Sequence, residues 1–354
     1  MTNFSWPQVL SVLVAGQNLT QGQAAWAMNE MMHGRASLAQ MGAFMMALRT
    51  KRETVQELTG LVNVMLDSAV KLETGSDALD IVGTGGDLVG TVNISSMASI
   101  VAAAAGIPVL KHGSRSASGK TGSSEMLEEL GIRLDLSPDQ VAKVFAEEGI
   151  TFFFAPVFHP AMRHVAPARK ELGVPTTFNF LGPLANPAQP IATALGVADA
   201  EIAPLMAAEL ATRGRTAIVF RSNDGLDELS TTSDNAIWQV SEGKIATMDF
   251  DAREIGIERA SVEQLLGGDA RHNAQIAKKL FSGEEFQNST AISDIVCLNA
   301  AVGITAYDLA KDSKESETEI NQRLSVAFAK AQTALTSGAA LAKIKHWSLL
   351  SQTI

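Results

Sequence analysis

The chain has 354 residues and a formal net charge of −10, and 46% of its residues are hydrophobic. This hydrophobic content excludes an intrinsically disordered protein, and the length is sufficient for two domains or for one large domain with a substantial core. The acidic balance argues against a general surface for nucleic acid or for an anionic membrane. We therefore expect neither nucleic acid nor a membrane as a partner.

The sequence also lacks the features of an exported protein. It starts with Met-Thr-Asn-Phe-Ser-Trp-Pro, without a basic segment followed by an apolar one, so we expect no secretory signal. No uncharged apolar stretch approaches the ~20 residues of a membrane span. The single cysteine, Cys297, lies in an apolar helical pattern that is typical of a core thiol. These observations predict a cytoplasmic protein.

Residues 1–72 show helical patterns throughout. Four hydroxyl residues are each followed three positions later by Gln or Glu, as in the capping boxes that begin helices: Ser5…Gln8, Thr20…Gln23, Ser37…Gln40 and Thr54…Glu57. Gly16 and Gly34 lie where the first two helices are expected to end. The helices are rich in Met and Ala, so we expect an apolar face that a second copy of the chain covers. The sequence thus predicts a small helical domain.

From residue 79 onward, short apolar runs alternate with helical patterns. The runs cover 79–82, 107–110, 150–154 and 215–220, and the helical stretches between them cover 96–105, 123–130, 138–148 and 201–212. This alternation predicts an α/β domain with a mainly parallel central sheet. Two long helices, at 289–310 and 317–335, are predicted to close the chain, and the acidic segment 313–320 is predicted to be a solvated loop and helix start.

A basic and Gly/Pro-rich segment, 159–187, interrupts the alternation. We predict that part of it, 165–187, returns to the helical domain of residues 1–72. The α/β domain would then comprise 73–164 and 188–354.

The first apolar run ends in a glycine loop, Gly83-Thr84-Gly85-Gly86-Asp87, which leads into a helix near Ser96. Glycines allow backbone N–H groups to approach an anion, and a helix N-terminus carries partial positive charge. The loop does not match the dinucleotide fingerprint G-x-G-x-x-G, because Leu88 stands where the third glycine would be. An ordinary glycine turn explains this loop equally well when it is considered alone.

A second loop follows the next run and carries Lys111, His112, Arg115 and Lys120, with no Asp or Glu between 111 and 124. It is one residue too long for the P-loop pattern, and an exposed basic loop would be unremarkable by itself. Together, however, the two loops are expected at the carboxyl ends of neighbouring strands, where α/β proteins bind ligands. The pair favours a phosphate-ester substrate, such as a diphosphate.

A third motif is Asp224-Gly225-Leu226-Asp227-Glu228, which follows the run at 215–220. Adjacent carboxylates at a strand end suit Mg²⁺, which keeps several waters and commonly bridges to substrate phosphates. A turn with surface acids is the simpler interpretation of the motif alone, and the two anion loops favour the metal. His159 and His164 lie five apart without a cysteine partner, so no zinc site is predicted.

Seven motifs in this order resemble the anthranilate phosphoribosyltransferase family: GTGGD (83–87), NISS (93–96), KHGSR (111–115), GKTGSSEMLEELGI (119–132), HPAMRHVAPARKELG (159–173), FNFLGPLANP (178–187) and DGLDELS (224–230). The resemblance covers nearly the whole chain. It implies a small all-helical domain plus an α/β domain of the nucleoside phosphorylase/phosphoribosyltransferase type, and a homodimer joined through the helical domains. The implied reaction joins anthranilate to 5-phosphoribosyl 1-diphosphate and releases diphosphate, in tryptophan biosynthesis.

The resemblance also implies roles for individual residues. Lys111, His112 and Arg169 would act in catalysis, with Arg169 meeting the anthranilate carboxylate, and Mg²⁺ would be held by Ser95, Asp227 and Glu228. His112 would accept the amine proton or order the backbone, and the residues alone do not decide between these roles. The implied substrate contacts are Gly83, Gly86, Asp87, Thr91, Asn93, Ile94, Ser95, Ser96, Lys111, His112, Gly113, Ser114, Arg115, Ser116, Ala117, Ser118, Gly119, Ser123 and Arg169.

Two positions depart from the family pattern. Ser114 stands where the family has an Asn that contacts anthranilate, and a hydroxyl is shorter than an amide and has one donor fewer. Leu88 follows Asp87, where family members commonly have Gly. We expect phosphoribosyl transfer to be retained despite both differences. The identity of the acceptor substrate follows less directly from the sequence.

Two further hypotheses remain open from the sequence. A pyrimidine-nucleoside phosphorylase shares the fold and a related basic loop, but it would not need Asp227 and Glu228 for magnesium. A non-enzymatic relative that binds nucleic acid should have basic helical surfaces and eroded glycine or acidic motifs. The net charge of −10 and the intact motifs disfavour the second hypothesis.

Overall fold

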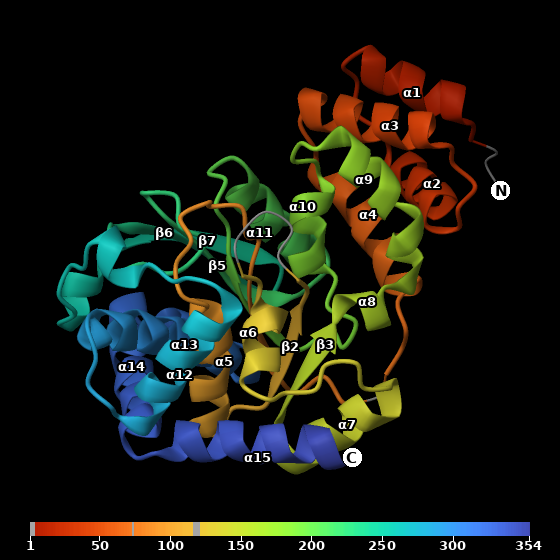
Figure 1. Cartoon of the computed structure of the whole chain (residues 1–354). Helices are drawn as coiled ribbons and strands as arrows, with labels where there is room; N and C mark the ends of the chain where they lie inside the picture. The colour runs from red at the N-terminus through yellow and green to blue at the C-terminus, as the bar shows by residue number, and fades with distance from the viewer. Residues whose placement is uncertain (1–3, 73, 116–120) are drawn as a thin grey trace.

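The computed structural model describes residues 4–72, 74–115 and 121–354. The N-terminal part folds into a bundle of four helices, α1 (Trp6–Val14), α2 (Gln21–Met32), α3 (Leu38–Lys51) and α4 (Val55–Asp67), which stands to one side of the sheet (Figure 1). Met28, Met31 and Met45 are fully buried in its core. Most methionines of this methionine-rich region therefore fill the hydrophobic core.

Three of the four predicted capping boxes are formed. Thr20, Ser37 and Thr54 each accept the backbone N–H three residues later, and the Gln or Glu at that position bonds back. The fourth prediction was wrong, because Ser5 caps no backbone amide and its hydroxyl instead contacts the Gln8 side chain at 3.0 Å. Gly16 and Gly34 follow α1 and α2 with φ of +68° and +69°, which confirms the predicted helix ends.

The larger part is built on a seven-stranded sheet with the order β3-β2-β1-β4-β5-β6-β7. The first five strands are parallel: β1 (Leu79–Gly83), β2 (Val109–Gly113), β3 (Ile150–Phe154), β4 (Ala192–Gly196) and β5 (Thr216–Ser222). An antiparallel hairpin, β6 (Asn235–Ser241) and β7 (Lys244–Phe250), extends one edge. The predicted α/β architecture with a mainly parallel sheet is therefore confirmed.

The sequence analysis did not identify β4 or the hairpin. The strand β4 has the sequence ATALG, which lacks the long branched and aromatic residues that mark strands, yet it is completely buried between β1 and β5. Most residues of β7 are exposed because this strand forms the sheet edge, so it shows no apolar run.

Helices cover both faces of the sheet. One face packs against α5 (Ile94–Ala104) and α13 (Ser289–Lys311), and outside these lie α12 (Ala270–Ser282), α14 (Ile320–Thr336) and α15 (Ala339–Thr353) (Figure 1). The other face packs against α11 (Ile202–Thr212), which also contacts α4 of the bundle. This part also contains α6 (Ser123–Glu129), α7 (Pro138–Glu148) and three short 3-10 helices, η3 (Ala252–Ile255), η4 (Val262–Leu265) and η5 (Ser313–Glu317).

The predicted end of the chain was incomplete, since α15 follows the two expected helices and α12 precedes them. Helix α12 alternates charged and apolar residues at helical spacing, but it lies among polar segments. Helix α13 is long and apolar enough to cross a membrane, yet 72% of its most apolar window is buried in the protein. Cys297 lies in this helix, and burial raises the pKa of its thiol to about 12, as expected for a core residue.

The segment that interrupts the α/β alternation runs from the sheet to the bundle. It contains α8 (Ala155–Phe158), η1 (Pro160–His164), α9 (Ala166–Leu172), α10 (Phe178–Leu181) and η2 (Gly182–Leu184). Helix α9 contacts α3, α10 contacts α4 and η1 contacts α2, whereas η2 contacts β2. Val165, Ala168 and Leu181 share one hydrophobic core with the bundle. These contacts support the proposed division of the chain, in which 165–187 joins the helical domain.

Candidate active site

Three neighbouring strands, β1, β2 and β4, each end in a glycine: Gly83, Gly113 and Gly196. A side chain at Gly83 would overlap the Asp227 carboxylate, and one at Gly196 would overlap the Asp227 backbone. A Cβ at Gly113 would lie 2.5 Å from Ser123 Oγ. The glycines therefore allow Asp227 and the start of α6 to pack directly on the strand ends, which gathers distant loops at one edge of the sheet.

The predicted first anion loop lies at this edge. Gly85 and Gly86 have positive φ and exposed positions, and the Gly85 N–H donates to Asp227 Oδ2 at 2.6 Å. Leu88 also has a left-handed backbone, with φ of +58°, and it is 76% exposed. Thr91 and Asn93 then lead into α5, whose first turn holds Ile94, Ser95 and Ser96. The hydroxyl of Ser96 is buried without a hydrogen-bond partner among the described residues.

Asp227 and Glu228 meet the same helix end. Glu228 Oε1 accepts the Ser95 N–H at 3.2 Å, and both carboxylates are 8% exposed. Burial, with repulsion from Asp87, raises the pKa of Asp227 to about 7. Burial and repulsion from Asp227 also raise the pKa of Glu228. Asp87 and Asp227 thus lie close enough to add repulsion to the effect of burial on the two raised carboxyl groups, so this edge favours a cation.

Lys111 is a buried ammonium group that lies close enough to Asp227 and Glu228 to be attracted by both. It lies on β2, is only 2% exposed, and donates from Nζ to the Ile81 carbonyl at 2.5 Å. Its Nζ also lies 3.5 Å from Ser95 Oγ. Burial lowers the pKa of Lys111, against the attraction of Asp80 and of the two carboxylates. The side chain is therefore held in one orientation at the helix end.

His112 follows Lys111 on β2, and Asp80 lies on the neighbouring strand β1. The fully buried Asp80 accepts the His112 N–H at 3.3 Å and the Asn186 side-chain N–H at 2.8 Å, and burial raises its pKa to about 6. Burial, with repulsion from His159, lowers the pKa of His112 well below its usual value. The His112 ring is therefore neutral near pH 7, and its buried Nε2 has no hydrogen-bond partner in the described part of the chain.

Ser114 and Arg115, the next described residues of the basic loop, are more exposed. Arg115 pairs with Glu128 at 2.9 Å and lies over the Phe154 ring, and its side chain is 54% exposed. Ser114 is exposed, and its carbonyl accepts Ser123 Oγ at 3.4 Å. The predicted contacts Ser116, Ala117, Ser118 and Gly119 lie outside the described residues.

Arg169 comes from α9, on the side of the helical bundle. It is partly buried, burial lowers its pKa, and its guanidinium has no hydrogen bond or ion pair among residues 4–72, 74–115 and 121–354. The neighbouring Arg163 and Lys170 are exposed. Arg169 is thus a shielded cation without a carboxylate partner in the described part of the protein.

One part of the site was missed by the sequence analysis. Residues 265–269, hereafter the glycine brace, pair with the first anion loop: Val92 N–H donates to the Leu265 carbonyl, and Gly267 N–H donates to the Gly90 carbonyl, each at 2.9 Å. Thr121 Oγ1 donates to the Gly268 carbonyl at 2.9 Å. The available signal was Gly267-Gly268-Asp269 directly before an amphipathic helix, which indicates a turn and an N-cap.

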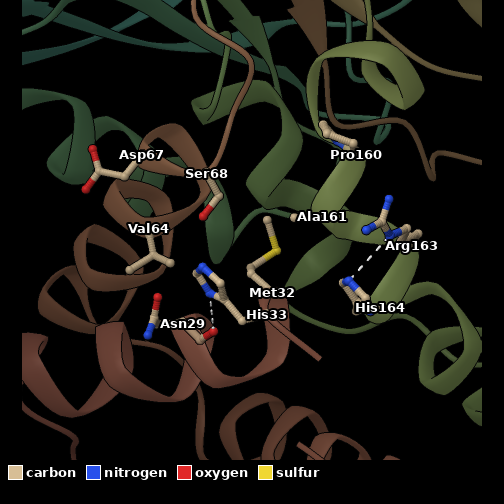
Figure 2. A pocket seen from close by; sticks show the side chains of 10 residues that line it. All are labelled: Asn29, Met32, His33, Val64, Asp67, Ser68, Pro160, Ala161, Arg163 and His164. Atoms are coloured by element: carbon tan, nitrogen blue, oxygen red, sulfur yellow. Dashed lines mark hydrogen bonds between the residues drawn. The ribbon is translucent and has the colours of Figure 1, made fainter. Parts of the chain in front are cut away.

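A separate cavity of about 570 Å³ lies between α2, the end of α4 and η1 (Figure 2). His33 Nδ1 is bonded to the Asn29 carbonyl at 2.9 Å, and Arg163 Nε contacts His164 Nε2 at 3.4 Å. Asp67 and Ser68 line the opposite wall. None of the predicted site residues that the structure describes lines this cavity, so it is distinct from the strand-end site.

The acidic pair also bears on metal binding. Within the described ranges, no three His, Cys, Asp or Glu side chains converge closely enough to bind a metal by themselves. This geometry does not suit zinc, which is held by three or four protein ligands. It does suit Mg²⁺, which takes one or two carboxylates and completes its shell with water and substrate oxygens.

Comparison with known proteins matches residues 7–69 to the helical bundle domain of a glycosyl transferase family, and residues 75–341 to the a/b domain of that family. The chain is 50% identical over 343 residues to the anthranilate phosphoribosyltransferase of Leifsonia xyli subsp. xyli, with 97% of each chain covered. It is 48% identical to that of Acidothermus cellulolyticus, covering 98% of this chain and 96% of the relative. The chain belongs to the anthranilate phosphoribosyltransferase family.

Solved structures agree with this family assignment. Anthranilate phosphoribosyltransferase from Thermus thermophilus superposes with a TM-score of 0.87 at 35% identity, covering 98% of this chain and 99% of that one. The enzyme from Saccharomyces cerevisiae, in complex with PRPP and Mg, has the same fold, with a TM-score of 0.86 at 24% identity and coverage of 99% and 98%. The two-part architecture is therefore that of the family.

Proposed function

We propose that this protein is an anthranilate phosphoribosyltransferase, which joins 5-phosphoribosyl 1-diphosphate and anthranilate to give N-(5-phosphoribosyl)anthranilate and diphosphate. The proposal rests above all on the full-length relationship to enzymes of that name, at up to 50% identity. The strand-end site supports it, since a glycine loop, a helix N-terminus and a buried ammonium group meet there. The product is an intermediate of tryptophan biosynthesis, and we place the enzyme in the cytoplasm.

Magnesium is proposed as the cofactor. Asp227 and Glu228 would hold it, with Ser95 at the adjacent helix end, and the ion would neutralise charge on the diphosphate of the substrate. The raised pKa values of Asp227 and Glu228 support a cation at this position, because burial and nearby carboxylates make their negative charges unfavourable. The yeast relative, which is 24% identical to this chain and shares its fold, has a solved structure in complex with PRPP and Mg.

The phosphoribosyl diphosphate would lie across the two anion loops. We assign it to the backbone of Gly83, Gly86 and Asp87, to Thr91 and the first turn of α5, and to the basic loop that begins at Lys111. As the bond to ribose C1 breaks, charge builds on the departing diphosphate. The oriented N–H groups and Lys111 stabilise that charge without having to reorganise.

Anthranilate would then enter from the side of the bundle. The guanidinium of Arg169 lacks a carboxylate partner among the described residues, and a planar guanidinium binds a carboxylate through two parallel hydrogen bonds. The neutral His112 has a buried Nε2 without a hydrogen-bond partner among the described residues. Because the pKa of His112 is depressed, we assign it to ordering the backbone beside the acceptor more than to holding a proton.

A homodimer through the helical domain is also proposed. Several large apolar side chains are exposed there, including Val14 of α1 at 82%, Leu38 and Met46 of α3, and Val174 after α9 at 48%. Helix α3 contacts both α1 and α9, so these residues share one part of the bundle. Sedimentation of the purified protein tests this, and a monomer at micromolar concentration would contradict it.

The reaction is tested by product analysis with phosphoribosyl diphosphate, magnesium and a panel of aromatic amines. We expect phosphoribosylanthranilate and diphosphate, with anthranilate the best acceptor. Phosphorolysis of pyrimidine nucleosides without magnesium would instead favour the phosphorylase hypothesis. The acidic pair and the family relationship disfavour that alternative and the nucleic-acid-binding one.

The acceptor assignment has its own test. Arg169→Ala should raise KM for anthranilate about tenfold, the equivalent of one lost charge-assisted hydrogen bond, while phosphoribosyl diphosphate binding stays within about twofold. Ser114→Asn should keep activity, since it adds an amide donor at the acceptor position. Lys170→Ala on the same helix is the exposed control. Unchanged anthranilate saturation in Arg169→Ala, together with lost turnover in Ser114→Asn, would point to a different acceptor.

A further inference from the structure

The side chain of Asn273 connects the two anion loops through the glycine brace. It lies in the first turn of α12 and is only 1% exposed. Its Oδ1 accepts the Gly268 N–H at 2.8 Å, and its Nδ2 donates to Asn93 Oδ1 at 2.9 Å. Asn93 Nδ2 in turn donates to the Gly122 carbonyl at 3.2 Å. An unbroken chain of amides thus runs from the brace, through the residue before α5, to the residue before α6.

The surrounding backbone leaves room for this network of amide hydrogen bonds. A Cβ at Gly267 would lie 2.6 Å from Asn273 Oδ1 and 2.9 Å from the Thr91 carbonyl, so only glycine allows this approach. The Asp269 side chain accepts the His272 N–H at 2.8 Å and so fixes the first turn of α12. Since Gly268 N–H takes one end of the Asn273 amide, the other end must present its donor to Asn93.

We propose that Asn273 is a positioning residue for the phosphoribosyl diphosphate site, a role that rests on the proposed function. It sets the orientation of the Asn93 amide, and through Asn93 it ties the start of α5 to the start of α6. Those two helix starts carry the ends of the glycine loop and of the basic loop. One buried amide therefore fixes the spacing between the loops that would hold opposite parts of the same substrate.

The test uses Asn273→Asp, which keeps an acceptor for the Gly268 N–H and removes the donor to Asn93. The Asn93 amide is then expected to turn over and to lose its bond to Gly122. We expect KM and the directly titrated Kd for phosphoribosyl diphosphate to rise about 5- to 50-fold, the effect of one or two buried hydrogen bonds, with KM for anthranilate within about twofold. Arg271→Ala, an exposed change on the same turn, is the matched control and should resemble the parent.

A double-mutant cycle with Asn93→Ala separates positioning from general stability. If Asn273 acts through Asn93, the change at 273 adds little, less than about twofold, to the Kd of the Asn93→Ala protein. Additive effects, equal weakening of both substrates, or an unchanged Kd in a folded Asn273→Asp protein would each overturn the proposal. If Asn273→Asp does not fold, the cycle is repeated with Asn273→Ser, which keeps a short polar group. A parent protein that binds phosphoribosyl diphosphate without transferring it would refute the proposed function alone, because the titration still measures the network.

Discussion

Two groups of buried charges differ in how far the protein itself satisfies them. In the helical bundle, the fully buried Glu57 accepts the Leu19 N–H at 2.8 Å, the Thr54 N–H at 2.8 Å and the Lys51 ammonium at 2.9 Å. At the strand ends, burial raises the pKa of both Asp227 and Glu228, and repulsion from Asp87 on Asp227 and from Asp227 on Glu228 raises them further.

We interpret Glu57 as a structural charge and the Asp227-Glu228 pair as the proposed cation site. Breaking a fully satisfied buried pair costs stability, because an uncompensated charge remains. Neutralising crowded carboxylates relieves repulsion, so the cost should fall on the bound cation and on turnover. The following predictions test this contrast, beginning with the largest expected effect.

Glu57→Ala should lower the free energy of unfolding by about 3–5 kcal/mol, since Lys51 and the Leu19 N–H lose their buried partner. Turnover by the fraction that stays folded should change less than about twofold, because Glu57 lies in the bundle. Urea unfolding followed by circular dichroism measures the stability. Gln23→Ala, which removes the corresponding group from the α2 capping box, should cost only about 1 kcal/mol. Similar losses for both variants would mean that Glu57 is an ordinary cap.

Asp227→Asn with Glu228→Gln should reverse that pattern. We expect turnover to fall about 100- to 1,000-fold, the range for loss of a principal electrostatic group at a reaction centre, while the unfolding midpoint is unchanged or higher. Chelation of magnesium should reproduce the kinetic loss in the parent and have little effect on the double variant. Near-parental turnover of the double variant at limiting magnesium would assign these carboxylates to another task.

The two cations of the KHGSR motif should also differ. Lys111→Ala is expected to weaken phosphoribosyl diphosphate binding by about 1.5–3 kcal/mol, since it removes a fixed, buried charge. Arg115→Ala should cost less than about 1 kcal/mol, because its guanidinium is half exposed and already pairs with Glu128. Separate titrations of both substrates measure these effects. Equal weakening of anthranilate by Lys111→Ala would make this lysine a scaffold residue.

His159 offers a smaller, pH-dependent contrast. Its Nε2 is 3.0 Å from the Ala185 carbonyl, and burial lowers its pKa to about 4. Between pH 6.5 and 4 the unfolded chain therefore binds a proton that the folded protein does not, so His159 makes the protein less stable as pH falls. Relative to His159→Gln, the parent should lose about 1.5 kcal/mol between pH 6.5 and 5. Parallel stability curves for the two proteins over that interval would show that His159 does not resist protonation.

Local patterns in the sequence were enough to predict that most groups of the candidate strand-end site lie at one edge of the sheet. Parallel strands place their carboxyl ends at one edge of a sheet, so the glycine loop, the KHGSR motif and the Asp227-Glu228 pair are expected to meet there. The capping boxes at Thr20, Ser37 and Thr54 were equally local, because hydroxyl, backbone and Gln or Glu lie within one turn. Ser5 failed the same rule, since its hydroxyl bonds to the Gln8 side chain.

Tertiary packing decided what spacing along the chain cannot carry. Burial made Lys111 a fixed internal ammonium group and left Arg115, four residues later, half exposed. Tertiary packing also placed the small-residue strand β4 between β1 and β5. It brought Asn273 into contact with Asn93, 180 residues away in the sequence. The sequence by itself determined which chemical groups and helix ends the chain possesses. Only the folded structure determined which of those groups lose water and share partners, because desolvation depends on everything that packs around a group.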